Sequence, residues 1–169
     1  AFERAGTDYI AVNAAGCGTM MKEYDHLLAT EPQWRERAAR IASKVRDWSE
    51  LLAAAGPKRG GAMRVRVAYD APCHLLHAQR ISGPPIDVLR AIPELELVAL
   101  NETEMCCGSA GIYNLVEPDT SDGVLDRKLD NIATARPEVV ATGNPGCLMQ
   151  IGAGLLRSGS PIRAVHPID

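Results

Sequence analysis

The chain has 169 residues, of which 46% are hydrophobic, and a formal net charge of −3. A domain of this length buries roughly 70% of the surface of its unfolded chain, so it can form a core without disulfide bonds. Acidic and basic residues are interspersed, and there is no Lys and Arg stripe interleaved with aromatic residues, which excludes nucleic acid as an expected partner.

No apolar run approaches the ~20 residues that a membrane helix requires, and residues 1–8 carry no secretory pattern. We therefore expect a cytoplasmic protein that meets the inner face of a membrane only through its partners. The chain has five cysteines, two of them adjacent. An odd number with an adjacent pair is awkward for a disulfide framework and favours metal or redox use in a reducing compartment.

Short apolar segments alternate with helical patterns along the chain. The segments that predict strands are residues 9–13, 65–69, 95–100, 139–142 and 163–165. They are apolar throughout instead of alternating with polar residues, which is typical of strands buried on both faces of a parallel sheet.

The longest helical pattern lies between the first two predicted strands. Apolar residues recur there at steps of four and three from Trp34 to Ala55, which places them on one side of a helix. Thr30 favours its start and Pro57 its end, so we predict one long connecting helix. Further helices are predicted at about residues 20–28, 86–90, 125–133 and 148–156.

The alternation predicts an α/β fold, with a doubly wound, mostly parallel sheet and helices on both faces. An internal sequence similarity bears on domain organisation. A strand followed by Asn13-Ala-Ala-Gly-Cys17 and a helix is matched by a strand followed by Asn144-Pro-Gly-Cys147 and a helix. We predict that residues 1–56 are the remnant of a first cysteine-rich repeat plus the long connecting helix. Residues 57–63 then form a linker, and residues 64–169 a second, complete repeat.

Four cysteines of the second repeat fall at predicted strand-to-helix junctions: Cys73, the pair Cys106 and Cys107, and Cys147. In a parallel sheet these junctions share the carboxyl edge, where open α/β folds place their sites. The free N–H groups at helix N-termini favour thiolate over thiol. Four thiolates are the ligands that an iron-sulfur cluster requires.

The runs around these cysteines are Tyr69-Asp-Ala-Pro-Cys73-His74, Cys106-Cys-Gly108, Cys107-Gly-Ser-Ala-Gly111-Ile-Tyr-Asn114 and Asn144-Pro-Gly-Cys147-Leu-Met-Gln150. They resemble the cysteine-rich (CCG) domain shared by glycolate oxidase iron-sulfur subunits, their lactate-utilisation and anaerobic glycerol-3-phosphate dehydrogenase relatives, and the cysteine-rich subunit of heterodisulfide reductase. The resemblance covers residues 64–169 and, as a half-repeat, residues 8–28. Within this family the glycolate oxidase iron-sulfur subunit is the most similar.

The resemblance implies a [4Fe-4S] cluster held by Cys73, Cys106, Cys107 and Cys147, with Gly108 and His74 beside it. It implies a domain without its own catalytic residues, which carries electrons in a flavin-dependent 2-hydroxy-acid dehydrogenase that converts glycolate to glyoxylate. The implied partners are flavin-containing dehydrogenase subunits, an upstream ferredoxin-like module with the first repeat, and a quinone or other electron acceptor.

Two positions depart from the heterodisulfide reductase pattern, in which each repeat ends in Cys-x-x-Cys. Gln150 and Met20 stand where the last cysteine of that motif would be. This favours a four-cysteine electron relay over disulfide-cleaving chemistry.

Alternatives remain at this stage. Four thiolates, or three with His74 or His77, suit the tetrahedral preference of zinc, which would make the chain a zinc-stabilised interaction domain. The adjacent cysteine pair could act as a thiol-disulfide switch, and the chain could serve a lactate-utilisation or heterodisulfide-reductase-like complex. Cys17 is as compatible with an idle thiol as with a ligand.

Overall fold

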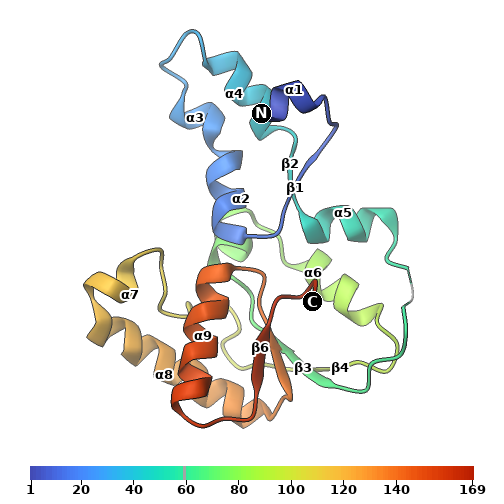
Figure 1. Ribbon diagram of the computed structural model, residues 1–169, viewed down its shortest axis with the longest axis vertical. Helices are drawn as coiled ribbons and strands as arrows, with labels where there is room; N and C mark the ends of the chain where they lie inside the picture. The colour runs from blue at the N-terminus through green and yellow to red at the C-terminus, as the bar shows by residue number, and fades with distance from the viewer. Residues whose placement is uncertain (59) are drawn as a thin grey trace.

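The computed structural model describes residues 1–58 and 60–169. Figure 1 shows two parts, one above the other. The N-terminal part comprises α1 (Phe2–Ala5), β1 (Ile10–Val12), α2 (Ala15–Lys22), α3 (Tyr24–Leu27), α4 (Arg35–Ala42), β2 (Val45–Asp47) and α5 (Trp48–Ala55). The C-terminal part comprises β3 (Arg66–Tyr69), the π-helix η1 (His74–Ala78), α6 (Gly83–Arg90), β4 (Glu96–Val98), α7 (Tyr113–Val116), α8 (Pro118–Ala135), β5 (Val139–Ala141), α9 (Pro145–Arg157) and β6 (Arg163–Val165).

The C-terminal part is built on a four-stranded parallel sheet in the order β4-β3-β5-β6. The central strands pair in register, with Val67 opposite Val139 and Tyr69 opposite Ala141. Because neighbouring side chains of a strand point to opposite faces, β5 contributes to two separate cores. Val140 packs with α8 and α9 on one face, and Val139 packs with α6 on the other. The predicted α/β class, with helices on both faces of a parallel sheet, is confirmed.

The N-terminal part has its own small sheet, in which β1 and β2 pair in parallel. The prediction of one long helix from Trp34 to Ala55 is wrong, because β2 interrupts it. Val45 is β-branched and fully buried opposite Ile10, and the backbone of Asp47 is extended, with φ −65° and ψ 146°. The apolar spacing continued by coincidence across a helix, a strand and a second helix.

Asp47 ends β2 and begins α5 through a capping box. Its carboxylate accepts hydrogen bonds from the Ser49 backbone N–H at 2.9 Å and from the Ser49 hydroxyl, and the Glu50 carboxylate accepts from the Asp47 N–H at 2.8 Å. The reciprocal bonds satisfy N–H groups that a helix start leaves free. Asp47, Ser49 and Glu50 thus carried a helix-start signal that the apolar spacing concealed.

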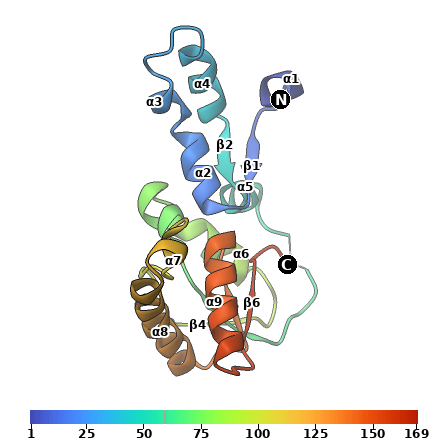
Figure 2. The same cartoon turned by 60° about the vertical axis from the view of Figure 1, so that its left-hand side comes forward.

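The other predicted elements are found close to their predicted positions. All five predicted strands form, and the helix expected at residues 20–28 begins earlier and is divided into α2 and α3. The two parts meet where α2 contacts η1 and where α5 contacts α6, and Figure 2 shows this junction from a second side. The predicted linker, residues 57–63, includes Arg59, which lies outside the described residues. The division into a half-repeat and a complete repeat stays a prediction.

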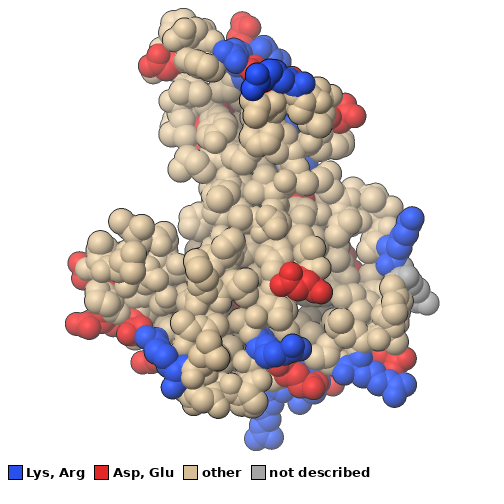
Figure 3. All heavy atoms as spheres, in the orientation of Figure 1, with Lys and Arg blue, Asp and Glu red and all other residues tan. Residues whose placement is uncertain are grey.

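Charges of both signs lie side by side on the surface. On the face in Figure 3 they gather mainly at the two ends of the molecule, with a largely uncharged band between them. Several form exposed ion pairs, such as Arg157 with Asp122 at 3.1 Å, which contribute little to stability. Within the described ranges, none of the helices has the length and apolar character that crossing a membrane requires.

We expect the Asp47 cap to contribute measurably to folding. Asp47→Ala removes the acceptor for both Ser49 donors and should lower the free energy of unfolding by about 1 kcal/mol, as measured by urea denaturation. Asp47→Asn keeps a side-chain acceptor and is the matched control, since asparagine caps helices well. Equal unfolding midpoints for Asp47→Ala and the parent chain would contradict the assignment.

Candidate metal centre

Cys73 lies just beyond the carboxyl end of β3, where the chain turns into η1. It is the residue before that π-helix and is half-buried. The carbonyl of Pro72 accepts hydrogen bonds from the N–H groups of both Leu75 and Leu76, at 2.9 Å each. This turn fixes the backbone on either side of Cys73, and the imidazole Nδ1 of His74 lies 3.6 Å from the Cys73 sulfur.

Cys106 and Cys107 lie in the connection between β4 and α7. The backbone N–H of Gly108 donates to the Cys106 sulfur at 3.4 Å. Gly108 has φ +90°, and a Cβ atom at this position would lie 2.5 Å from the carbonyl oxygen of Ser121 on α8. The Ser121 hydroxyl donates to the Gly108 carbonyl at 2.9 Å. Glycine is therefore required here both by the backbone angle and by the close approach of α8.

Cys147 lies in the first turn of α9, directly after β5 and the cap residue Asn144. The side-chain amide of Asn144 donates to the Cys147 sulfur at 3.5 Å, and its oxygen accepts from the backbone N–H of Gly16 at 3.1 Å. Cys147 and Cys107 both belong to the apolar core under α8 and α9, with exposed fractions of 4% and 2%.

The structure brings the four predicted cysteines together. Each of the four side chains lies close enough to the next to affect its pKa, in the order Cys73, Cys106, Cys107, Cys147, and we call this group the cysteine row. All are free thiols. Their role as ligands stays a prediction.

Protons are shared unequally along the cysteine row. Hydrogen bonds from Cys107 and Cys73 lower the pKa of Cys106, and a hydrogen bond from Cys107 lowers that of Cys147. The same contacts raise the pKa of Cys73 and Cys107, with burial acting in the same direction. The direction of the shift alternates along the row, so Cys106 and Cys147 are its more readily deprotonated members.

Of the other predicted site residues, one lies beside the cysteine row and the others are exposed. His74 lies beside Cys73, whereas His77 is exposed on η1. Cys17 and Met20 are exposed on α2. Among residues 1–58 and 60–169, no group of three or more His, Cys, Asp or Glu side chains is placed to hold a single metal ion. This finding gives the zinc alternative no support.

Sequence reasoning missed the polar groups that support the cysteine row. Gln150 was read only as a missing cysteine. Its amide donates to the Ser121 hydroxyl at 3.0 Å, and its oxygen accepts from the Asn114 amide at 3.0 Å. It thereby connects α9 to α8 and to α7. A second group, the ion pair of Lys128 and Asp70, had no sequence signal because the two residues lie far apart in the chain.

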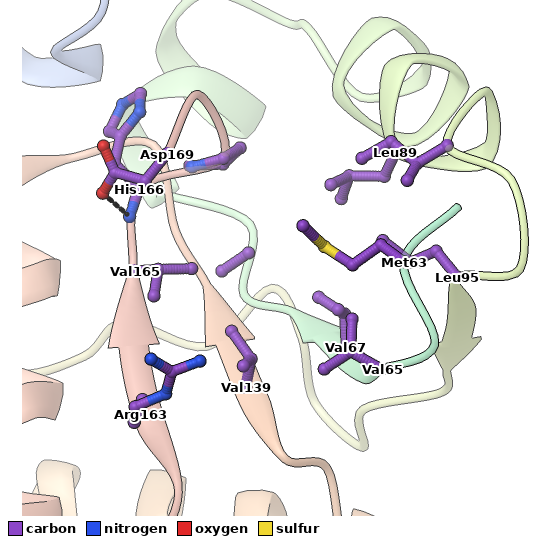
Figure 4. Close-up of a pocket in the computed structure, with 13 residues that line it drawn as sticks. Met63, Val65, Val67, Leu89, Leu95, Val139, Arg163, Val165, His166 and Asp169 are labelled. Carbon is purple, nitrogen blue, oxygen red and sulfur yellow. Dashed lines mark hydrogen bonds between the residues drawn. The ribbon is translucent and has the colours of Figure 1, made fainter. Parts of the chain in front are cut away.

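An apolar pocket of about 340 Å³ lies on the sheet face that packs against α6. Figure 4 shows Met63, Leu89 and Val165 around it, with His166 and Asp169 at one side. The backbone N–H of His166 donates to the Asp169 carboxylate at 3.1 Å. None of the residues that line this pocket is a cysteine.

Comparison with known proteins agrees with the position of these cysteines. Residues 67–152, from β3 to the middle of α9, match the family described as "Cysteine-rich domain" (CCG). The chain belongs to this family. The matched range contains every member of the cysteine row, and the resemblance predicted from the sequence is confirmed.

Several known proteins are similar over almost the whole chain. The chain is 38% identical to the "Probable glycolate oxidase iron-sulfur subunit" of Bacillus subtilis (strain 168), with all of this chain and 39% of the relative covered. It is 31% identical to "Lactate utilization protein A" of Exiguobacterium sp., covering 98% of this chain and 68% of the relative, and 29% identical to the protein of that name from Geobacillus kaustophilus. The chain thus spans less than half of the first relative and about two thirds of the others.

We predict that the glycine of the CCG motif is needed for the fold of the site. Gly108→Ala places a methyl group against the Ser121 backbone and forces an L residue to φ +90°, which should cost roughly 1–3 kcal/mol of unfolding free energy. Gly111→Ala is the matched control. Gly111 also has positive φ, at +73°, but nothing lies within 4 Å of its added Cβ. If the two variants lose equal stability, the close approach of α8 has no separate effect.

Proposed function

We propose that this CCG domain is the electron-transfer part of a hydroxy-acid oxidation complex, in which Cys73, Cys106, Cys107 and Cys147 hold a [4Fe-4S] cluster. The observation that carries the proposal is the cysteine row itself. Four thiols from three separate connections converge at one edge of a parallel sheet. Such convergence is not needed for the core, where an isolated cysteine packs as a small hydrophobic residue.

The surroundings of the cysteine row suit an anionic cluster. Backbone and amide N–H groups donate to two of the sulfurs, from Gly108 to Cys106 and from Asn144 to Cys147. Such donors stabilise thiolates and tune the potential of iron-sulfur clusters. Cys147 also lies in the first turn of α9, where the helix dipole favours negative charge.

The relatives support iron-sulfur chemistry over zinc. The B. subtilis relative is described as an iron-sulfur subunit. A bound cluster would supply one-electron chemistry. The protein's part is to hold it and to control its exposure to water. Cys107 and Cys147 are buried while Cys73 and Cys106 are half-buried, so one side of the site faces the core and the other the surface, where electrons can enter and leave.

The relatives' names support a proposal for the wider complex. We infer a flavin-containing dehydrogenase partner that oxidises a small 2-hydroxy acid, with glycolate favoured by the B. subtilis relative and lactate by the others. An upstream ferredoxin-like module and a first repeat would belong to the same relay, which would end at a quinone or another acceptor. The chain would then act as a non-flavin subunit, and the acid itself need not touch this domain.

Anaerobic reconstitution with iron and sulfide tests the proposal. The chain should bind about four iron and four sulfide per molecule, as the proposed cluster type requires, and become paramagnetic on one-electron reduction. Single Cys→Ser changes at each position of the cysteine row should abolish or strongly reduce iron binding. Cys17→Ser is the matched control and should retain it, because Cys17 is exposed on α2.

Two results would contradict the proposal. One is stoichiometric zinc that resists exchange while iron reconstitution fails under the same anaerobic conditions. The other is iron binding that survives all four serine changes in the cysteine row.

A further inference from the structure

A buried ion pair lies beneath the cysteine row. Lys128 Nζ lies 2.8 Å from Asp70 Oδ1, and the two side chains are 0% and 2% exposed. Their contact is ionic and departs from hydrogen-bond geometry, since Asp70 Oδ1 has no hydrogen-bond donor among the described residues. Taking two charges out of water costs so much that an apolar pair is often as stable or more so. Stability alone therefore does not account for a charged pair at this position.

The ion pair touches all three connections that carry the cysteine row. Asp70 directly follows β3 and precedes Cys73. Lys128 donates to the Glu102 carbonyl at 3.2 Å and lies 3.5 Å from that of Thr103, in the connection that leads to Cys106. Thr142 directly follows β5, on the way to Cys147, and its hydroxyl donates to Asp70 Oδ2 at 3.1 Å.

Helix α8 also holds the segment of Cys106 and Cys107 on both sides of the two cysteines. Lys128 binds the connection that precedes Cys106 and Cys107. Ser121, on the same buried side of α8, binds Gly108, which follows the two cysteines. Glu102 itself has φ +50°. Its carboxylate is held by Arg127 and Asn131, both from α8. A non-glycine residue keeps such a backbone angle only where its surroundings fix it, so this connection is held in one conformation.

We propose that Lys128 is a positioning residue, whose buried ion pair with Asp70 fixes the spacing of the three cysteine connections and so brings the four thiols together. Its consequence for metal binding rests on the proposed function. The spacing of the thiols does not rest on the proposed function, because it can be measured without metal.

The test compares Lys128→Met, Asp70→Asn and the double variant with the parent chain. Lys128→Met keeps the length of the side chain and removes the cation. The double variant leaves no unpaired buried charge, so its thermal stability should recover toward that of the parent chain. The spacing of the connections should not recover in the double variant, because this variant still lacks the cation that Asp70, Glu102 and Thr103 share. Ile132→Ala is the matched control, since it removes a fully buried side chain of the same helix that packs in the core under α8 and α9.

The first measurement uses the metal-free protein. Diamide oxidises two neighbouring thiols to a disulfide and takes up both electrons and both protons. The rate at which Cys73 and Cys106 become linked, followed by mass spectrometry below the unfolding transition, reports how closely the connections are held. We expect this rate to fall roughly tenfold in Lys128→Met and in the double variant, as for misplaced reacting groups, and to stay near the parent value in Ile132→Ala.

The second measurement follows iron after anaerobic reconstitution. Loss of iron to a chelator should be roughly tenfold faster in the double variant, the usual effect of removing a group that orients metal ligands, and unchanged in Ile132→Ala. The paramagnetic signal of the reduced protein should change in the double variant and stay unchanged in Ile132→Ala.

The outcomes separate the two proposals. If the double variant recovers its stability, its disulfide rate and its iron retention together, the pair acts only on folding and the positioning role is wrong. If Lys128→Met is too unstable to study, the double variant, which also lacks the cation, carries the comparison with the parent chain and Ile132→Ala. A parent chain that binds no iron overturns the proposed function, while the disulfide rates still decide whether Lys128 positions the thiols.

Discussion

The parallel register of β4, β3 and β5 is the constraint on which the cysteine row depends. All three strands end at one edge, and Cys73, the pair Cys106 and Cys107, and Cys147 lie in the connections that leave that edge. A slip of one residue between β3 and β5 would move the strands by roughly 3.3 Å and turn their side chains to the opposite face. Because Cys73 follows β3 and Cys147 follows β5, such a slip would shift the two cysteine connections relative to each other. The two apolar cores on either face of β5 make that slip costly, because Val139 and Val140 would exchange environments.

The site is continuous with the core of the C-terminal part. Cys107 and Cys147 pack with Leu125, Ile151 and Leu155, which keeps water from one side of the cysteine row. Low polarity strengthens each hydrogen bond to a sulfur and penalises negative charge that is not compensated. The balance between this apolar wall and the N–H donors of Gly108 and Asn144 would set the potential of a cluster in this place.

Much of this arrangement was predictable from the sequence, because its signals are local. Five apolar segments gave the strands, and the cysteines stood at their ends, so the shared edge followed from the rule for parallel sheets. The break in the predicted long helix was missed because its apolar spacing continued across β2, although the capping residues of α5 marked the break. The ion pair of Lys128 and Asp70 was not predictable. A lysine on an amphipathic helix normally faces water, and only the folded chain brings it to a buried aspartate.

Asn144 connects the two parts of the molecule through a single side chain. Its oxygen is bound to the backbone of Gly16 at the start of α2, and its nitrogen is bound to the Cys147 sulfur. An amide group is planar and rigid, so a tilt of α2 that pulls on the oxygen also rotates the nitrogen away from the sulfur. The seating of α2 on the C-terminal part and the donor to one buried sulfur of the cysteine row therefore depend on the orientation of the same amide plane.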